Sequence, residues 1–327
     1  MSLVEVEDVW YRYPGGERPV VQDVELSLGR GDVVAVVGES GCGKTTVGKL
    51  VAGLLRPVSG RLRFEGEDVN ALRGARKSDW RRAVQMVHQD PYASLNPSVT
   101  VGSALRFGPR HFGVVDRGDV EDMLLGLLDD VGLEATEGFL RRYPHELSGG
   151  QRQRVAIARA VSVNPRVIVA DEVTSMLDVS MRVAILDLLL AFQKTRGLSY
   201  LFISHDFGVV RYFAKGGRVV VMFYGVVVED GRTDDVIYGP LHPYTRMLLD
   251  SIPVPDPLAA RSRKRLPIVQ GSTRAAGCVF SGRCWFAEDR CRDEKPVLVE
   301  RRSGHRVACF FPERTESLGQ VDAEVSR

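Results

Sequence analysis

The stretch "DVVAVVGESGCGKTTVGKLVAGLL", residues 32–55, decides the fold of this chain. Its first part is a continuous apolar run, typical of a β-strand buried on both faces, and its last part has the pattern of a helix. Between them, "GESGCGKT" matches G-x-x-x-x-G-K-[ST], the pattern of a phosphate-binding loop, in the strand–turn–helix context that such a loop needs. The sequence therefore predicts an α/β protein with a phosphate site.

The residues of this loop have distinct expected roles. Its glycines let backbone N–H groups turn towards phosphates, while Lys44 adds a positive charge and Thr45 can place its hydroxyl on Mg²⁺. Cys42 is expected to be a small structural residue of the loop. The predicted nucleotide-binding residues are Gly38, Glu39, Ser40, Gly41, Cys42, Gly43, Lys44, Thr45 and Thr46.

A second apolar run, "VIVADE", ends in two adjacent acids at residues 171 and 172. Asp171 can hold the water shell of Mg²⁺, and Glu172 can act as the general base on an attacking water. The alternative is that both acids only cap the next element.

Strands and helices alternate along most of the chain. Residues 3–9 and 20–28 alternate apolar and polar residues as strands do, residues 100–145 have helical spacing, and strands are expected at "RVIVADE", "SYLFISH" and around "RVVVMFYGVVVEDG". This order predicts a mainly parallel α/β sheet. The proline-rich and basic stretch "IPVPDPLAARSRKRLP" then predicts a linker before a cysteine-bearing extension of little periodicity.

Composition excludes several classes of protein. The chain carries 44 lysines and arginines against 42 acids, a net charge of +2, which argues against nucleic acid as a partner. The N-terminus has no secretory signal pattern, and no run of eighteen apolar residues occurs. A soluble, cytosolic protein is expected.

The stretch "LSGGQRQRVAIARAV", residues 147–161, lies between the two phosphate motifs. Here the sequence resembles the nucleotide-binding subunits of ABC transporters, whose signature is LSGGQ ahead of a basic helix. The resemblance implies that Ser148, Gly149, Gly150 and Gln151 contact ATP held by the P-loop of a second subunit. One chain would then supply two half-sites.

Other positions match the family one by one. The resemblance implies that Tyr13 stacks on adenine, with Tyr11 as the competing candidate, and that Asp178 in "SMLD" belongs to the D-loop at the dimer interface. It also implies that Gln89 in "MVHQDPYASLNP" and His205 in "ISHD" act with Glu172 in catalysis. The Mg²⁺ ligands would be Thr45, Gln89 and Asp171.

Two positions depart from the family pattern. Val173 stands where a proline is usual after the catalytic glutamate, and Met176 stands where the D-loop usually has alanine. Neither touches the phosphate chemistry directly, but both bear on how two half-sites close.

The implied fold is a P-loop NTPase, an ABC nucleotide-binding domain at residues 1–250. It comprises a RecA-like core, an antiparallel β subdomain and an α-helical subdomain at about 96–160. Residues 251–327 would form the linker and a small C-terminal extension with four cysteines.

Two further stretches, "HQDPYASLNP" and "GPLHPYTRMLLDSIP", are similar to the ATPase subunits of oligopeptide, dipeptide and nickel importers. That resemblance implies a peripheral subunit on the cytoplasmic face of the cell membrane. Its partners would be a second, related but different ATPase subunit, two transmembrane permeases and an extracytoplasmic substrate-binding protein. For "HPYT" itself we expect only a turn, in which His242 and Tyr244 pack the extension onto the core.

Four of the five cysteines lie in the extension, with the spacing Cys278-x5-Cys284-x6-Cys291-x17-Cys309. These gaps are too wide for paired zinc knuckles, whereas iron–sulfur clusters accept looser spacing. The importer resemblance implies a 4Fe–4S cluster, and zinc or four unligated thiols stay open as alternatives.

The leading functional hypothesis is an ATP-hydrolysing motor subunit of a peptide or related solute importer, with ATP and Mg²⁺ as ligands. One alternative is a soluble ABC protein that acts on nucleic acid or ribosomes. Another is a redox or metal sensor in which ATP binding gates signalling with negligible turnover.

Overall fold

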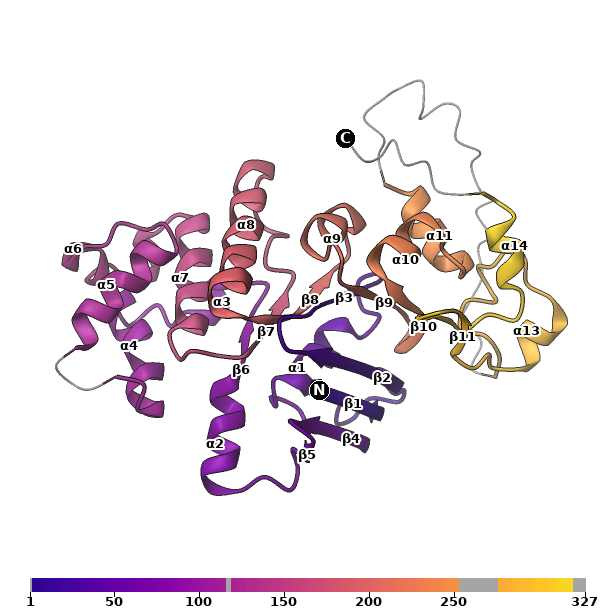
Figure 1. Cartoon of the computed structure of the whole chain (residues 1–327), viewed down its shortest axis with the longest axis horizontal. Coiled ribbons are helices and arrows are strands. Elements are labelled where there is room, and N and C mark those ends of the chain that lie inside the picture. Colours follow the sequence, from indigo (N-terminus) through magenta and orange to yellow (C-terminus); the bar gives the residue numbers. More distant parts are fainter. Residues whose placement is uncertain (1, 116–118, 253–275, 320–327) are drawn as a thin grey trace.

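The computed structural model describes residues 2–115, 119–252 and 276–319. Its central feature is an eight-stranded sheet, drawn in Figure 1. The strands are β3 (Val33–Val37), β6 (Val84–Val87), β7 (Val167–Asp171), β8 (Ser199–Ser204), β9 (Arg218–Phe223), β10 (Val226–Arg232), β11 (Val299–Arg302) and β12 (His305–Val307). Their order is β11-β12-β10-β9-β3-β8-β7-β6. From β9 to β6 all neighbours pair in parallel, which confirms the predicted parallel sheet.

Strand β3 is buried on both faces, as its apolar run predicted. Val33, Ala35 and Val37 belong to one hydrophobic core, and Val34 and Val36 to another. Helices α8 (Val179–Arg196) and α9 (Phe207–Phe213) pack into the first core, whereas α1 (Lys44–Val51) packs into the second. Because successive side chains of a strand point to opposite faces, β3 contributes to both hydrophobic cores.

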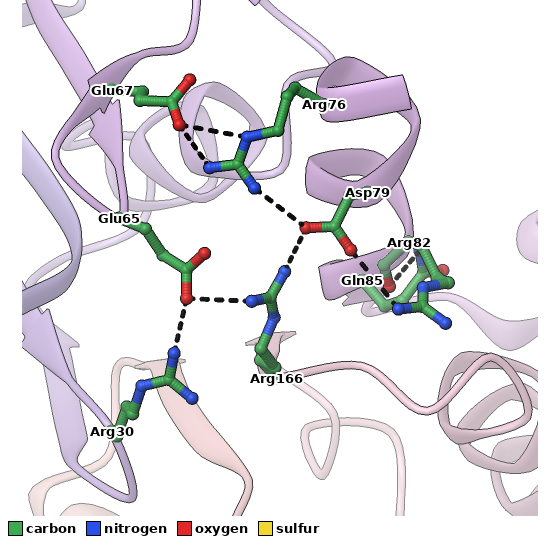
Figure 2. A network of polar contacts seen from close by, with 8 residues as sticks. All are labelled: Arg30, Glu65, Glu67, Arg76, Asp79, Arg82, Gln85 and Arg166. Atoms are coloured by element: carbon green, nitrogen blue, oxygen red, sulfur yellow. Dashed lines mark hydrogen bonds and ion pairs between the residues drawn. The ribbon is translucent and has the colours of Figure 1, made fainter. Parts of the chain in front are cut away.

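A smaller antiparallel sheet completes the second core. Its strands are β1 (Ser2–Tyr11), β2 (Val21–Gly29), β4 (Ser59–Phe64) and β5 (Glu67–Asp68), in the order β2-β1-β4-β5. It is followed by α2 (Gly74–Ala83). Figure 2 shows Arg166, just before β7, between two carboxylates: it donates to Glu65 at 2.9 Å and to Asp79 of α2 at 2.6 Å. These two hydrogen bonds of Arg166 connect the smaller sheet and α2 to the central sheet.

A lobe of helices lies at one end of the molecule, on the left in Figure 1. It contains α3 (Pro91–Ser94), α4 (Val101–Phe112), α5 (Val120–Asp130), α6 (Glu137–Leu140), the 3-10 helix η1 (Pro144–Glu146) and α7 (Gly149–Val161). The helical spacing of residues 100–145 is therefore confirmed, while the boundary of a helical subdomain at about 96–160 stays a prediction.

The C-terminal extension lies at the opposite end in Figure 1 and joins the central sheet. After α10 (Thr233–Tyr238) and α11 (Pro243–Asp250), it contributes α13 (Asp289–Asp293), the hairpin β11–β12 and α14 (Pro312–Glu316). Strand β12 pairs antiparallel with β10, and Phe280, Cys278 and Cys291 belong to the first hydrophobic core. Most of the predicted linker lies outside the described residues.

None of the helices in the described part of the chain is both long enough and apolar enough to span a membrane.

Candidate active site

The P-loop joins the end of β3 to the start of α1, and its conformation depends on glycine. Gly43 has φ +106°, and a Cβ at this position would lie 2.5 Å from the carbonyl oxygen of Val20, so only glycine fits. The Lys44 ammonium donates to the carbonyl oxygens of Gly38 at 2.7 Å and Glu39 at 3.0 Å. Cys42 is buried, as expected of a structural residue.

Thr45 and Asp171 meet across the loop. The Thr45 hydroxyl donates to Asp171 Oδ1 at 2.9 Å, although 126 residues separate the two in sequence. Burial raises the pKa of Asp171 above its usual range. A divalent cation beside Asp171 would favour its ionised form, so this pair fits two of the three expected Mg²⁺ ligands, whereas the third, Gln89, contacts Glu172.

Glu172 lies at the centre of the predicted catalytic group. Its Oε2 is 3.1 Å from His205 Nδ1 and accepts from Gln89 Nε2 at 3.3 Å, and its Oε1 is 4.0 Å from the Lys44 ammonium. Its φ of +47° is uncommon for a non-glycine residue, while its N–H still donates to the carbonyl of Ile203. Gln89, Glu172 and His205 follow the neighbouring parallel strands β6, β7 and β8, so they meet at the carboxyl edge of the sheet.

The two aromatic candidates for adenine stacking differ in accessibility. Tyr13 is 38% exposed, and its hydroxyl lies 3.3 Å from Thr46 Oγ1, at the start of α1. Tyr11 is 7% exposed and packs edge-on against Tyr13. The geometry favours Tyr13 as the residue that a base can reach.

The signature residues begin helix α7 in the helical lobe. Ser148 accepts from the N–H of Gln151 at 3.2 Å, and the Gln151 side chain accepts in return from the Ser148 N–H at 2.9 Å. Among the described residues, no hydrogen bond joins this segment to the P-loop. Asp178, the expected D-loop residue, accepts from the Met181 N–H at the start of α8 and is exposed.

Sequence reasoning missed two residues that contact the P-loop from the C-terminal region. The stretch "HPYT" begins helix α11 where a turn was expected, and its Tyr244 is fully buried and accepts through its hydroxyl from the Glu39 N–H at 2.8 Å. Arg283, next to Cys284, donates through both Nη atoms to the two carboxylate oxygens of Glu39, each at 2.8 Å. No local pattern signals a contact across 205 or 244 residues, so only the fold reveals it.

The four cysteines of the extension line one small pocket. It is bordered by Cys278, Cys284, Cys291 and Cys309, together with His242 and Ser281. Burial raises the pKa of Cys278, and raises those of Cys284 and Cys309 to about 12. These three thiols are therefore neutral at physiological pH unless a cation binds them.

Two buried polar atoms at this pocket lack partners. Burial lowers the pKa of His242 to about 3, and its Nδ1 accepts from the Tyr244 N–H, so the neutral ring carries its proton on Nε2. That Nε2 and the Ser281 hydroxyl have no hydrogen-bond partner among the described residues. Within the same residues, no group of three or more His, Cys, Asp or Glu side chains is arranged to hold a single metal ion.

Comparison with known families gives two matches. Residues 21–175 match the family described as "ABC transporter", and residues 228–291 match "Oligopeptide/dipeptide transporter, C-terminal region". The second match includes Tyr244, Arg283 and three of the four extension cysteines; Cys309 lies beyond it.

Individual proteins agree with these matches. The chain is 39% identical over 310 residues to the oligopeptide transport ATP-binding protein OppF of Salmonella typhimurium, covering 92% of this chain and 90% of that protein. It is 41% identical to the dipeptide transport ATP-binding protein DppF of Haemophilus influenzae over 88% and 87% of the two chains. The ATP-binding cassette MJ0796, solved as a dimer with ADP and Pi, is 28% identical with a TM-score of 0.62, over 70% of this chain and 98% of that one. These similarities favour the transporter hypothesis over the nucleic-acid and sensor alternatives.

Proposed function

Since this chain belongs to the ATP-binding proteins of ABC transporters, with the C-terminal region of the oligopeptide/dipeptide branch, we propose that it drives import of peptides or chemically related solutes. One observation carries the proposed site: Gln89, Glu172 and His205 converge beside Lys44 at the carboxyl edge of the sheet. This convergence supports the proposed roles of Glu172 as base, of Gln89 and His205 as its orienting groups and of Lys44 as the phosphate-binding cation.

The geometry supports a role for each side chain. Lys44 would exchange the carbonyls of Gly38 and Glu39 for phosphate oxygens when ATP binds. Glu172 would take the proton of the attacking water, and His205 and Gln89, both within hydrogen-bond reach of its Oε2, would hold that carboxylate and the water. Mg²⁺, held by the Thr45 hydroxyl and Asp171, would neutralise charge on the phosphates.

We place the second ATP contact in a partner subunit. The Ser148 segment lies at the N-terminus of α7, where a helix offers backbone donors and a positive dipole to a phosphate. Near Asp178, the side chains of Met176 and Val179 are 60% and 75% exposed. Apolar side chains this exposed suit a surface that a second ATPase subunit, identical or related, would cover.

The expected membrane partners have a suitable surface. Tyr92 of α3 and Phe107 of α4 are 61% and 73% exposed and follow Gln89 in the chain. Tyr92 lies three residues after Gln89, so a permease that contacts Tyr92 would act close to the proposed catalytic glutamine. Because the relatives are named as ATP-binding proteins of oligopeptide and dipeptide transport, we propose two permeases, an extracytoplasmic substrate-binding protein and a peripheral location on the cytoplasmic membrane face.

Replacing the base tests the motor. We expect Glu172→Gln to lower ATP hydrolysis by the assembled transporter by about 10²–10⁴-fold, because glutamine cannot accept the proton of the attacking water. Phosphate release is the measurement. The control is Glu137→Gln, an exposed acid of α6 paired with Arg141. Equal, low hydrolysis by wild type and Glu172→Gln would favour the sensor hypothesis.

We also propose that the four extension thiols hold an iron–sulfur cluster. Support comes from their shared pocket and from the two unpartnered buried donors at it, His242 and Ser281. The wide cysteine spacing is the reason to prefer a cluster to a single zinc ion, since paired zinc knuckles need closer cysteines. The iron ions of a cluster would bind the sulfur atoms of all four cysteines, and this would stabilise the extension.

Anaerobic purification tests the cluster. We expect a brown protein with about four irons and four labile sulfides per chain, as a 4Fe–4S cluster requires. Cys309→Ser should lose the iron, whereas Cys42→Ser, which changes a cysteine outside this pocket, should keep it. A colourless wild-type protein without iron or labile sulfide would show that the proposal is wrong.

A further inference from the structure

Glu39 of the P-loop is held at three points. Its N–H donates to the Tyr244 hydroxyl at 2.8 Å, its carboxylate accepts two hydrogen bonds from Arg283, and its carbonyl oxygen accepts from the Lys44 ammonium at 3.0 Å. The Tyr244 contact comes from α11 and the Arg283 contact from the C-terminal extension, so the loop that receives the phosphates is held by segments 205 and 244 residues further along the chain.

Arg283 lies between aromatic side chains of the core and of the extension. Its guanidinium lies 5.7 Å from the ring centre of Phe223 in β9 and 5.9 Å from that of Phe280 in the extension. Those two rings pack at right angles, with centres 5.3 Å apart, and Phe280 is fully buried. A planar fork held in this way loses little freedom when it binds a carboxylate at two points.

The negative charge of the Glu39 carboxylate is balanced by the Arg283 guanidinium. A carboxylate in a loop that must accept a polyanion repels the phosphates unless a cation neutralises it. The Arg283 and Glu39 side chains are about one third exposed, at 32% and 37%, so water alone screens this charge incompletely.

We propose that Arg283 is a positioning residue of the nucleotide site: it neutralises and holds Glu39, and thereby makes the C-terminal extension part of the site that binds ATP. Arg283 belongs to residues 278–284, the cysteine loop, so the conformation of this loop would influence the position of the guanidinium. The inference rests on ATP binding at the P-loop, but not on any occupant of the cysteine pocket.

Binding of Mg-ADP to the full-length chain tests the proposal, because it needs no hydrolysis. We expect Arg283→Ala to raise the Kd for Mg-ADP by about fivefold to tenfold at low salt, because the P-loop that binds the phosphates then carries an uncompensated carboxylate. The loss should shrink at about 0.5 M salt, which screens the repulsion. The double variant Arg283→Ala/Glu39→Gln should bind within about twofold of wild type, since it leaves no unpaired charge.

The matched control is Arg292→Ala, which removes an exposed arginine of the same extension, paired with Asp289. It should bind as wild type does. If Arg283→Ala fails to fold, Arg283→Gln, which keeps most of the stem, replaces it in both comparisons. Wild-type affinity in the single variant, or failure of Glu39→Gln to restore binding, would overturn the proposal. Absence of Mg-ADP binding by the wild type would instead contradict the nucleotide site itself.

Discussion

At the scale of single residues, the site depends on two residues whose backbone has a positive φ. Glu172 adopts a left-handed conformation, and Gly43 occupies a place where any Cβ would meet a carbonyl oxygen. The conformation of Glu172 costs energy and is of a kind that persists mainly at functional sites, whereas glycine adopts positive φ at position 43 without that cost. The sequence predicted the identity of these residues through its motifs, but their mutual distances come from the folded chain.

Tyr13 offers a prediction at this scale. We expect Tyr13→Ala to weaken Mg-ADP binding by about 1–3 kcal/mol, because stacking of a base on an aromatic ring has this magnitude. Tyr13→Trp should keep the affinity. Calorimetric titration measures both.

Tyr11 is the comparison, because its ring is nearly buried. Tyr11→Ala should lower the free energy of unfolding and leave the affinity of the folded fraction close to that of wild type. If a folded Tyr11→Ala protein lost the nucleotide while Tyr13→Ala kept it, the assignment would be reversed.

At the scale of elements, strand β10 joins the extension to the core through two buried acids. Glu229 accepts from the N–H groups of Leu241 and His242 and lies 2.7 Å from His305 Nε2 on β12. On the next residue, the Asp230 carboxylate accepts from Arg306 of β12 at 2.6 Å and from Arg218 of β9. The short strand β12 is therefore held to β10 by these side-chain contacts as well as by backbone hydrogen bonds.

We expect His305→Ala to lower the free energy of unfolding by about 2–3 kcal/mol, because a buried hydrogen bond to a carboxylate is lost. Urea unfolding of the full-length chain measures the change. His111→Ala, at an exposed position near the end of α4, should change it by less than about 0.5 kcal/mol. Equal stability of the two variants would contradict a fixing role for the buried pair.

The long, regular elements could be predicted from the sequence, whereas the hairpin of the extension could not. Strands β3, β7 and β8 are continuous apolar runs, so their burial shows in the sequence itself. Strand β11 is exposed at all four positions, and β12 has only three residues. Segments this short carry no periodicity, and their pairing depends on the edge that β10 presents.

At the scale of the whole molecule, the C-terminal extension is in direct contact with the P-loop. Arg283 of the cysteine loop is 244 residues from Glu39 in sequence, yet it binds the Glu39 carboxylate directly. Phe280 of the same loop shares a hydrophobic core with β3. The segment proposed as the second half-site lies elsewhere: Ser148 is exposed at the start of α7 in the helical lobe.

The sequence by itself determined the fold class, the phosphate loop, the identity of the catalytic candidates and the family, because these are written in short contiguous motifs and in local periodicity. Only the tertiary structure decided that the extension completes the central sheet, that the four thiols share a pocket, and that Arg283 and Tyr244 hold the P-loop. The physical reason is that these contacts join residues far apart along the chain, and their pairing follows from the packing of whole elements, which no local pattern encodes.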